Sequence, residues 1–461
     1  MTRRDFLIAG AGALTVGPLV AARPRPQRPP QSQARPRPTP SQLAWQRDEL
    51  AMFLHFGVNT FTDREWGDGQ ESPAIFAPSN LDARAWARTA KAAGFRALIL
   101  TAKHHDGFCL WPTRTTKHSV ASSPFRDGKG DLVREFVEAS RAEGLRVGLY
   151  LSPWDRNNPL YGDSPRYNDL YVDQLRELLG NYGEIAEVWF DGANGEGPNG
   201  KKQIYDWPRV WGEVRRLQPR AVVFSDAGPD VRWCGNESGS AGDPNWSTVN
   251  PDVVTAPGVS GPGIIDSLQH GDPDGTVWRP AEADTSIRPG WFHHPAEDAR
   301  VRSTDALVNL YFRSVGRNSK LLLNVPPTRD GVLHPTDVSR LLEFAERRRA
   351  MFGEDLVATA GGGAIGRITG GPGSGAEDHV TFNRDVSISM IRLEEPIERG
   401  QSVRSFVVHG TSAEGQTTEI VRGTTVGYAR LERFAPRRVT QVSVAVTTIG
   451  DAPPIGIKLF A

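Results

Sequence analysis

Short runs of apolar residues recur along the middle of the chain, and stretches with helical spacing separate them. Each run is continuous rather than alternating, which is typical of strands buried on both faces of a parallel sheet. The five clearest runs predict strands at 51–58, 95–101, 145–152, 186–190 and 221–225. The stretches between them predict helices at 81–93, 131–143, 167–179 and 210–217. Strands that alternate with helices in this way indicate an α/β fold.

The repeat predicts a closed barrel rather than an open sheet. Five units, a further strand at 320–325 and a helix at 338–351 leave room for eight strands. The glycine-rich phosphate turn of a dinucleotide-binding sheet does not follow the first strand. We therefore expect a (β/α)8 TIM-like barrel over residues 42–353. Its sixth and seventh strands should lie somewhere in 230–310, where the pattern is weak.

After about residue 354 the pattern changes to alternating stretches broken by glycine clusters. Candidate strands lie at 386–393, 403–408, 424–434 and 439–448. Because no run of helical period occurs among them, we expect a separate C-terminal β-sandwich domain over residues 354–461.

The N-terminus has the pattern of an export signal. Arg3 and Arg4 precede an apolar stretch at 6–20, and the small residues at 20–22 suit a cleavage site. The stretch is too short and too rich in glycine for a comfortable membrane span. We therefore expect residues 1–22 to be a twin-arginine signal peptide and the protein to be exported, to the periplasm or outside the cell. No integral membrane span is expected after its removal.

Charge is distributed unevenly, although the chain holds 54 basic and 54 acidic residues. The signal region contributes +1, and residues 23–41, in which five arginines are interspersed with prolines, contribute +5. Such a segment cannot bury apolar area, so we expect an extended Arg/Pro-rich linker there. The rest of the chain carries −6 and lacks the basic footprint of a nucleic-acid-binding protein. No nucleic-acid partner is therefore expected.

The two cysteines, Cys109 and Cys234, are too few for a disulfide scaffold. They would pair only if the chain became oxidised after export. Two free thiols are favoured, because a chain that folds before export does so in a reducing compartment. The 12 tryptophans are more than a core needs, and suggest that some of them stack on ligands.

Polar side chains gather where the predicted strands end, which is where a TIM barrel holds its chemistry. The candidates, in chain order, are His55, His104, His105, Asp191, Glu237 and Trp291. His55 lies near the end of the first strand, and Asp191 directly follows the fourth. We expect these side chains to meet at one end of the barrel.

Two carboxylates from different strand ends, with His and Trp around them, suit the cleavage of a glycosidic bond. That reaction needs one carboxylate near the anomeric carbon and one carboxylic acid beside the leaving oxygen, and Asp191 and Glu237 supply such a pair. A separation of about 5–5.5 Å between them would mean a covalent intermediate and retention of configuration. Burial against an apolar wall such as Trp233 would help the acid to keep its proton near neutral pH.

Each of these features also has a plainer interpretation. An Asp-Gly pair after an apolar run is often a turn or a helix cap, and a loop glutamate is usually solvated. His104–His105 and His293–His294 are candidate metal pairs, but adjacent residues on an extended segment point in opposite directions. No His-X-His or His-Glu-X-X-His spacing occurs, so neither a metal nor another cofactor is expected.

Several segments together resemble the α-L-fucosidases of glycoside hydrolase family 29, over nearly all of residues 42–461. The matching segments lie at 52–57, 59–62, 65–67, 101–108, 187–192, 322–327, 399–403 and 423–428. They include Met-Phe-Leu-His-Phe-Gly at the first of these positions and Glu-Val-Trp-Phe-Asp-Gly at the fifth. The resemblance implies a TIM barrel followed by a β-sandwich, and a retaining enzyme that removes L-fucose from oligosaccharides or glycoconjugates.

The same resemblance implies roles for single residues. Asp191 would be the nucleophile. The segment 233–237, Trp-Cys-Gly-Asn-Glu, is similar to the branch of the family that acts on α-1,3/1,4-linked fucosides, which implies that Glu237 is the acid/base. Trp291 would line the fucose pocket. The residues implied to hold the fucose hydroxyls are His55, Glu65, Trp66, His104 and His105.

Two alternatives remain open at this point. A non-catalytic fucose-binding protein on the same scaffold would use the sandwich as a carbohydrate module, although the presence of both carboxylates favours an enzyme. A metal-assisted hydrolase is the second alternative, because a fold does not fix a function.

Overall fold

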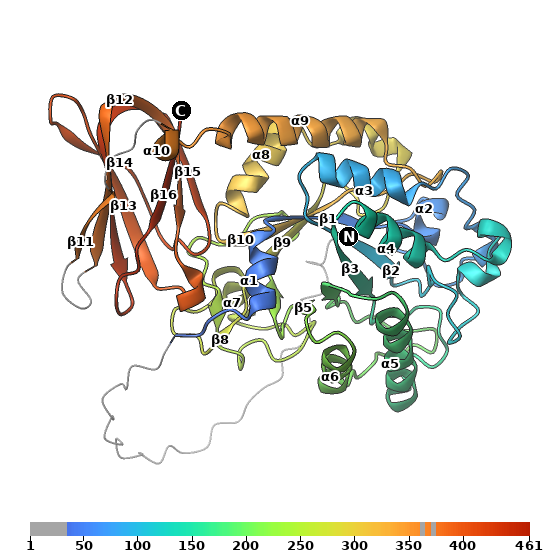
Figure 1. Cartoon of the computed structure of the whole chain (residues 1–461). Helices are drawn as coiled ribbons and strands as arrows, with labels where there is room; N and C mark the ends of the chain where they lie inside the picture. The colour runs from blue at the N-terminus through green and yellow to red at the C-terminus, as the bar shows by residue number, and fades with distance from the viewer. Residues whose placement is uncertain (1–34, 360–364, 370–374) are drawn as a thin grey trace, which may run out of the picture.

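The computed structural model describes residues 35–359, 365–369 and 375–461. Figure 1 shows a barrel ringed by helices, with a β-domain beside it at the C-terminal end of the chain. The predicted signal peptide and most of the predicted linker lie outside the described residues, so both stay predictions.

Eight parallel strands close into a barrel, which confirms the predicted TIM-like fold. Around the barrel they follow the order β1-β10-β9-β6-β5-β4-β3-β2. The sixth and seventh strands in the sequence of the barrel, β6 and β9, lie within the predicted interval 230–310. The strands are β1 (Leu50–Leu54), β2 (Ala97–Lys103), β3 (Arg146–Leu151), β4 (Glu187–Trp189), β5 (Val222–Ser225), β6 (Val231–Trp233), β9 (Ala281–Ser286) and β10 (Ser319–Asn324).

Helices cover the outside of the barrel close to the predicted positions. They are α3 (Ala83–Ala92), α4 (Leu132–Ala142), α5 (Ser164–Asn181), α6 (Trp207–Leu217), α8 (Thr304–Arg313) and α9 (Pro335–Phe352). The side chains of Asp82 and Asp131 cap α3 and α4 by accepting hydrogen bonds from backbone N–H groups of the first turn. Shorter helices are α1 (Pro40–Arg47), α2 (Val58–Thr62), α7 (Ile264–His270) and α10 (Leu356–Thr359). A short two-stranded antiparallel sheet pairs β7 (Thr248–Val249) with β8 (Val277–Trp278).

One unit departs from the expected strand–helix repeat. Residues 226–230, which the structure describes throughout, join β5 to β6 without a helix. The first residue of β6, Val231, pairs with Phe224 near the end of β5. The chain therefore need not travel back along the strand, and a crossover helix is not required.

The first strand is also shorter than the sequence predicts. Instead of reaching residue 58, β1 ends at Leu54, and α2 begins at Val58. His55 therefore lies just beyond the strand rather than within it. Its backbone N–H points to the side chain of Asn324, the last residue of β10, so the chain leaves the ladder at this position.

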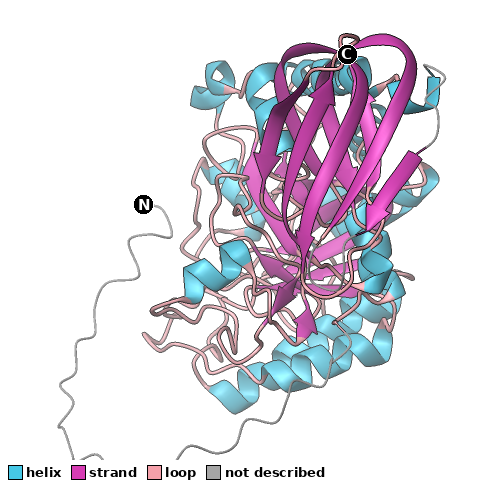
Figure 2. Cartoon of the chain, turned by 90° about the vertical axis from the view of Figure 1, so that its left-hand side faces the viewer, coloured by secondary structure: helices cyan, strands magenta, loops and turns pink. Residues whose placement is uncertain are grey.

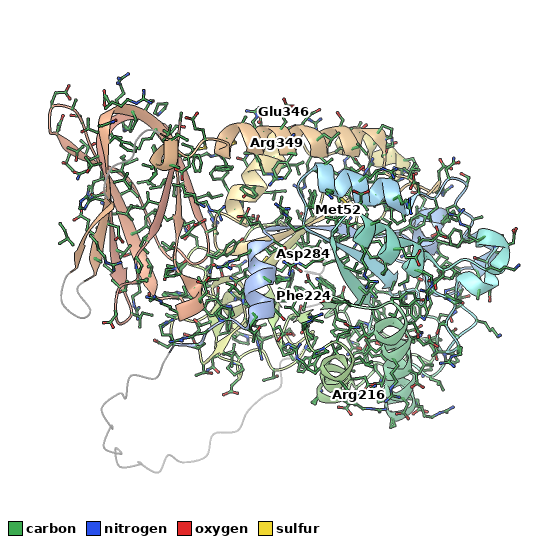
Figure 3. The ribbon with its side chains drawn as sticks, viewed as in Figure 1. Met52, Arg216, Phe224, Asp284, Glu346 and Arg349 are labelled. Atoms are coloured by element: carbon green, nitrogen blue, oxygen red, sulfur yellow. The ribbon has the colours of Figure 1, made fainter. Side chains whose placement is uncertain are left out.

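The barrel interior contains buried charge as well as apolar side chains. The Nζ atom of Lys320 lies 3.0 Å from Glu187 and 3.8 Å from Glu282. The indole of Trp189 donates to Glu282, and burial raises the pKa of that glutamate well above its usual range. Figure 3 labels Met52, Phe224 and Asp284 near the centre of this domain, and Arg216, Glu346 and Arg349 at its periphery.

Helix α1 closes the end of the barrel at which the strands begin. The indole of Trp45 donates to Glu187, the first residue of β4, and lies under the ammonium of Lys320. The guanidinium of Arg146, the first residue of β3, donates to the carbonyl of Ala44. This end of the barrel is therefore plugged, and the opposite end is left for a binding site.

The C-terminal domain is built of strands, as the sequence predicts, and these strands pair antiparallel (Figure 2). Its strands form one hydrogen-bonded sheet around an apolar core of their own. They are β11 (Ile365–Thr369), β12 (Ala376–Glu394), β13 (Val403–Thr411), β14 (Thr417–Gly423), β15 (Arg430–Thr448) and β16 (Gly456–Phe460). Register shifts where β12 pairs with β15 mark irregularities in these two long strands.

One predicted strand in this domain starts six residues too early. Residues 424–429 form a turn, and residues 430–434 belong with the strand predicted at 439–448 to the single strand β15. At this turn Gly427 has a positive φ of 65°, and an added Cβ would lie 2.1 Å from Asn318 of the barrel. The turn is therefore shaped by its contact with the barrel and not by strand pairing.

Polar contacts fasten the β-domain to the barrel. The guanidinium of Arg430 donates two hydrogen bonds to Asp243, at 2.8 and 3.0 Å. Asn318 accepts from the backbone of Tyr428, and Arg392 pairs with Glu49 at 2.7 Å. Among the helices of the described residues, none is both long enough and apolar enough to cross a bilayer.

Candidate active site

A cavity of about 350 Å³ opens at the ends of the barrel strands. It brings together all eight residues that the sequence singled out, which are His55, Glu65, Trp66, His104, His105, Asp191, Glu237 and Trp291. Sequence reasoning did not assign the other residues of the lining, which are Phe53, Tyr150, Trp189, Asp284, Pro289, Gly290, His294, Glu297 and Arg300. Tyr150 lies near the end of β3, so the strand-end rule that found Asp191 would also have found it.

Asp191 follows the end of β4, and the backbone two residues further on fixes its side chain. Its Oδ1 accepts from the N–H of Ala193 at 2.8 Å, so it forms the turn that an Asp-Gly pair suggests and also faces the cavity. Its Oδ2 accepts from the hydroxyl of Tyr150 at 3.2 Å. An added Cβ at position 192 would lie 2.1 Å from Oδ2 of Asp226 and 3.0 Å from the backbone nitrogen of Gly258, which favours glycine after the aspartate.

The tautomer of His105 follows from its contacts. The hydroxyl of Ser152 donates its single proton to the carbonyl of Trp154 at 2.7 Å. The same oxygen lies 2.7 Å from Nδ1 of His105 and must therefore accept a hydrogen bond from the Nδ1–H group. The other ring nitrogen, Nε2, lies 3.9 Å from Oδ2 of Asp191, and it carries a proton only when the ring is cationic.

Buried polar contacts of the preceding residue, Lys103, fix the backbone that carries His104 and His105. The ammonium of Lys103, which is fully buried, donates to Asp155 at 3.2 Å and to Gln174 at 2.9 Å. The ring of His104 stacks on that of Tyr150 with centroids 5.8 Å apart. The sequence places Lys103 directly before His104 and His105 but gives no sign of its buried contacts, which come from residues far along the chain.

His55 is locked in one neutral form. Its Nδ1 lies 2.8 Å from Oδ1 of Asn324, which can only accept, so Nδ1 donates. Burial lowers the pKa of His55 to about 4, so the ring is neutral at pH 7 and Nε2 is an acceptor. The amide of Asn324 also donates to the carbonyl of Trp291 at 2.8 Å, and the rings of His55 and Trp291 lie 5.1 Å apart.

Hydrogen bonds from the loop that carries Trp291 hold the side chain of Glu65 in place. Its carboxylate accepts from the backbone N–H groups of Trp291 and Phe292, and its Oε2 lies 3.0 Å from Nε2 of His294. Next to it, Trp66 is 36% exposed and meets Trp154 edge to face at 5.8 Å. Glu65 and Trp66 therefore form a polar and an apolar part of the same wall.

Glu237 lies in the loop after β6, where its side chain is half-buried. The side chain of Asn236 shapes this loop, since its amide donates to the carbonyl of Ser240 and its oxygen accepts from the N–H of Ser238. The sequence suggested Trp233 as an apolar wall for the acid. In the structure the indole of Trp233 donates to Asp284 at 2.7 Å, which ties β6 to β9.

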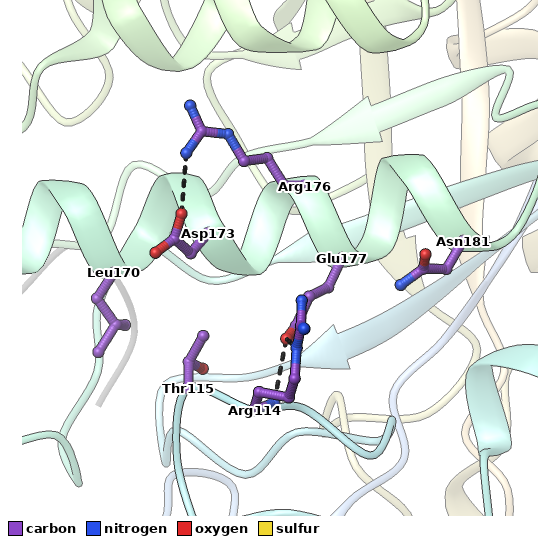
Figure 4. A pocket seen from close by; sticks show the side chains of 7 residues that line it. All are labelled: Arg114, Thr115, Leu170, Asp173, Arg176, Glu177 and Asn181. Carbon is purple, nitrogen blue, oxygen red and sulfur yellow. Dashed lines mark hydrogen bonds and ion pairs between the residues drawn. The ribbon is translucent and has the colours of Figure 1, made fainter.

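A second cavity, of about 530 Å³, lies on the outer side of the barrel along α5 (Figure 4). Its charged residues pair with one another: Arg176 with Asp173 at 2.9 Å and Arg114 with Glu177 at 3.5 Å. The carboxylate of Glu177 also accepts from Trp111 and Thr113. Because these charged groups pair with one another, they stabilise the outer surface of the barrel. No residue from the strand ends lines this second cavity.

Cys109 and Cys234 are both free and buried, and burial raises the pKa of each thiol. Within the ranges that the structure covers, no group of three or more His, Cys, Asp or Glu side chains is arranged to hold a metal ion. His293 and His294 bind different carboxylates, those of Asp298 and Glu65.

Comparison with known proteins identifies the family. The sequence profile of the α-L-fucosidase family matches residues 70–347. The chain is 43% identical to α-L-fucosidase 1 of Arabidopsis thaliana over 428 residues, which is 87% of this chain and 82% of that protein.

Solved structures agree with this. The crystal structure of SpGH29 is 41% identical, with a TM-score of 0.85 over 92% of this chain and 98% of that one. A GH29 fucosidase of Ruminococcus gnavus, solved with fucose bound, is 30% identical with a TM-score of 0.84, over 93% of this chain and 96% of that one. The chain therefore belongs to the α-L-fucosidases of glycoside hydrolase family 29.

Proposed function

We propose that the enzyme releases terminal α-1,3- and α-1,4-linked L-fucose from oligosaccharides or glycoconjugates by retaining double displacement. The observation that carries the proposal is the convergence of Asp191 and Glu237 on one cavity that also holds Glu65, His55 and Trp291. Two carboxyl groups beside hydroxyl-binding and stacking side chains are what such a reaction requires.

The reaction proceeds in two steps. In the first, a carboxylate oxygen of Asp191 forms a bond to the anomeric carbon, the glycosidic C–O bond breaks, and Glu237 gives its proton to the leaving oxygen. In the second, Glu237 takes a proton from water, the water oxygen bonds to the anomeric carbon, and Asp191 leaves as a carboxylate. Free fucose departs with its original α configuration.

The contacts of Asp191 suggest which oxygen attacks. Its Oδ1 is held by the N–H of Ala193, whereas Oδ2 lies beside the Tyr150 hydroxyl and the ring of His105. We assign Oδ2 as the attacking atom, with Tyr150 fixing its position. This fixation supplies the near-attack geometry that a nucleophile needs.

The sugar is held by acceptors of fixed orientation. Nε2 of neutral His55 accepts a hydrogen bond from one hydroxyl, and the carboxylate of Glu65 accepts hydrogen bonds from others. Trp291 and Trp66 supply apolar faces for the C–H groups of the ring. An uncharged sugar suits this site because its hydroxyls satisfy these acceptors without adding charge.

Linkage preference is tested by hydrolysis of α-1,2, α-1,3, α-1,4 and α-1,6 fucosides side by side. The similarity of segment 233–237 to the α-1,3/1,4 branch favours fast release from the α-1,3 and α-1,4 substrates. Equal or faster release from an α-1,2 or α-1,6 fucoside would overturn the linkage assignment. Proton NMR of the first-formed fucose tests the stereochemistry: the α-anomer is expected first, and the β-anomer would exclude retention.

Export belongs to the same proposal. The twin arginines Arg3 and Arg4, the apolar stretch and the small residues at 20–22 support a route by which the folded enzyme leaves the cytoplasm. Replacing both arginines by lysine should leave the enzyme inside the cell, as measured by activity in separated fractions. Unchanged export of that variant would exclude the twin-arginine route.

A further inference from the structure

His294 connects two carboxylates at the wall of the cavity. Its Nε2 lies 3.0 Å from Oε2 of Glu65, and its Nδ1 lies 2.8 Å from Oδ1 of Asp63. Carboxylate oxygens only accept, so both ring nitrogens must donate and the ring must be an imidazolium. The sequence marked His294 only as half of a candidate metal pair.

The charges around His294 favour this cationic form. The hydrogen bonds with Glu65 and Asp63, and the nearby charge of Glu297, raise the pKa of His294 to about 9 against the cost of burial. The neighbouring cation, Arg300, lies 4.0 Å from Glu297 and pairs with it. His294 therefore keeps its charge at neutral pH.

The backbone is shaped to bring the three side chains together. An added Cβ at Gly290 would lie 2.9 Å from Oε2 of Glu65 and 2.9 Å from the ring of His294, so a side chain there would push the pair apart. Asp63 has a positive φ of 55° at the end of α2, which turns the chain toward Glu65. His294 itself is only 13% exposed, so water competes weakly for its N–H groups.

We propose that His294 is a positioning residue that holds Glu65 in its sugar-binding orientation, with Asp63 as the anchor of the ring. The inference rests on the proposed role of Glu65 in binding fucose hydroxyls. Without the imidazolium, Oε2 of Glu65 keeps only the 3.3 Å hydrogen bond from the backbone N–H of Phe292. The carboxylate is then held less firmly in its orientation. The loss falls on substrate binding, because His294 acts through Glu65 and not on the reacting bond.

The test uses the full enzyme, an aryl α-L-fucoside and a range of pH from 6 to 10. His294→Gln should raise KM about tenfold at pH 7 and change kcat by less than about twofold, because a charge-assisted hydrogen bond is lost from binding alone. The KM of the wild type should rise as the pH passes about 9, where His294 loses its charge. His294→Gln should have a KM that does not change over the same range.

Asp63→Asn supplies a second, independent measurement. It removes one of the two carboxylates that raise the pKa of His294, so the rise in KM should begin at a lower pH than in the wild type. His270→Gln is the matched control, since His270 pairs with Asp266 at 2.9 Å on α7, outside the cavity lining. An unchanged KM in His294→Gln, or the same pH profile in Asp63→Asn and wild type, would overturn the inference.

Glu65→Gln separates this inference from the role of Glu65 itself. If Glu65→Gln leaves KM unchanged, the proposed role of Glu65 in binding fails. If Glu65→Gln weakens binding and His294→Gln does not, only the positioning role fails. When both roles hold, the double variant should bind no more weakly than Glu65→Gln alone, since the histidine acts through that carboxylate.

Discussion

The Nδ1 atom of His55 lies 2.8 Å from Oδ1 of Asn324, and the amide of the same asparagine donates to the carbonyl of Trp291. One side chain at the end of β10 thereby sets both the tautomer of a histidine and the position of a tryptophan in the cavity. Asn324 does not line the cavity itself, so it acts through its neighbours.

Asn324→Ala should impair both stability and binding. It leaves the Nδ1–H group of His55 and the carbonyl of Trp291 without their partner, at a cost of about 1–3 kcal/mol for each buried group. We expect a lower free energy of unfolding in urea and a KM for aryl fucosides raised about tenfold. A loss of stability with an unchanged KM would mean that Asn324 supports only the fold.

Asp191→Ala should abolish turnover and leave the fold intact. Removing a nucleophile from a double-displacement enzyme lowers kcat by at least about a thousandfold. The residual rate is measured with an aryl fucoside, and folding is checked by circular dichroism. Turnover within tenfold of the wild type would refute the assignment of Asp191.

Glu237→Ala should act differently on different leaving groups. An aryl fucoside with a good leaving group needs little protonation, so the fucosyl-enzyme still forms but is hydrolysed slowly without the base. Added azide needs no base and should restore the rate, giving a fucosyl azide of α configuration. Oligosaccharide substrates should not be rescued. Failure of azide to increase the rate would contradict the acid/base role.

The buried neutral His55 predicts a dependence of stability on pH. Its pKa is about 4 in the folded protein and near 6.5 when unfolded, so the unfolded chain binds the extra proton first as the pH falls. The free energy of unfolding should therefore decrease between about pH 6.5 and pH 4, by up to about 3 kcal/mol from this group. In His55→Gln that decrease should be smaller, and His270→Gln should keep the wild-type slope.

Apolar runs carried most of the fold prediction, and β9 shows where they fail. Its sequence, Ala-Glu-Ala-Asp-Thr-Ser, has no apolar run, yet every residue of it is buried. Glu282 and Asp284 are tolerated there because the indoles of Trp189 and Trp233 donate to them. A pattern of apolar residues cannot mark a strand whose buried carboxylates accept hydrogen bonds from side chains of other strands.

The candidate site was predictable where a residue carries its own signal. Asp191 follows an apolar run and precedes a glycine, and that pattern led to it. Asn324 and His294 matter through partners that lie far away in the sequence, at His55 and Asp63. Contacts between residues so far apart in the sequence cannot be predicted from spacing along the chain, and they become visible only in the folded structure.

Because α1 plugs the barrel where its strands begin, this helix lies on the side of the barrel opposite the cavity. A bead, a carrier protein or a cell surface coupled to that side would leave the cavity mouth facing outward. Immobilised in this orientation, the enzyme would stay open to bulky fucosylated glycans that a support coupled beside η5 (Pro295–Arg300) would obstruct.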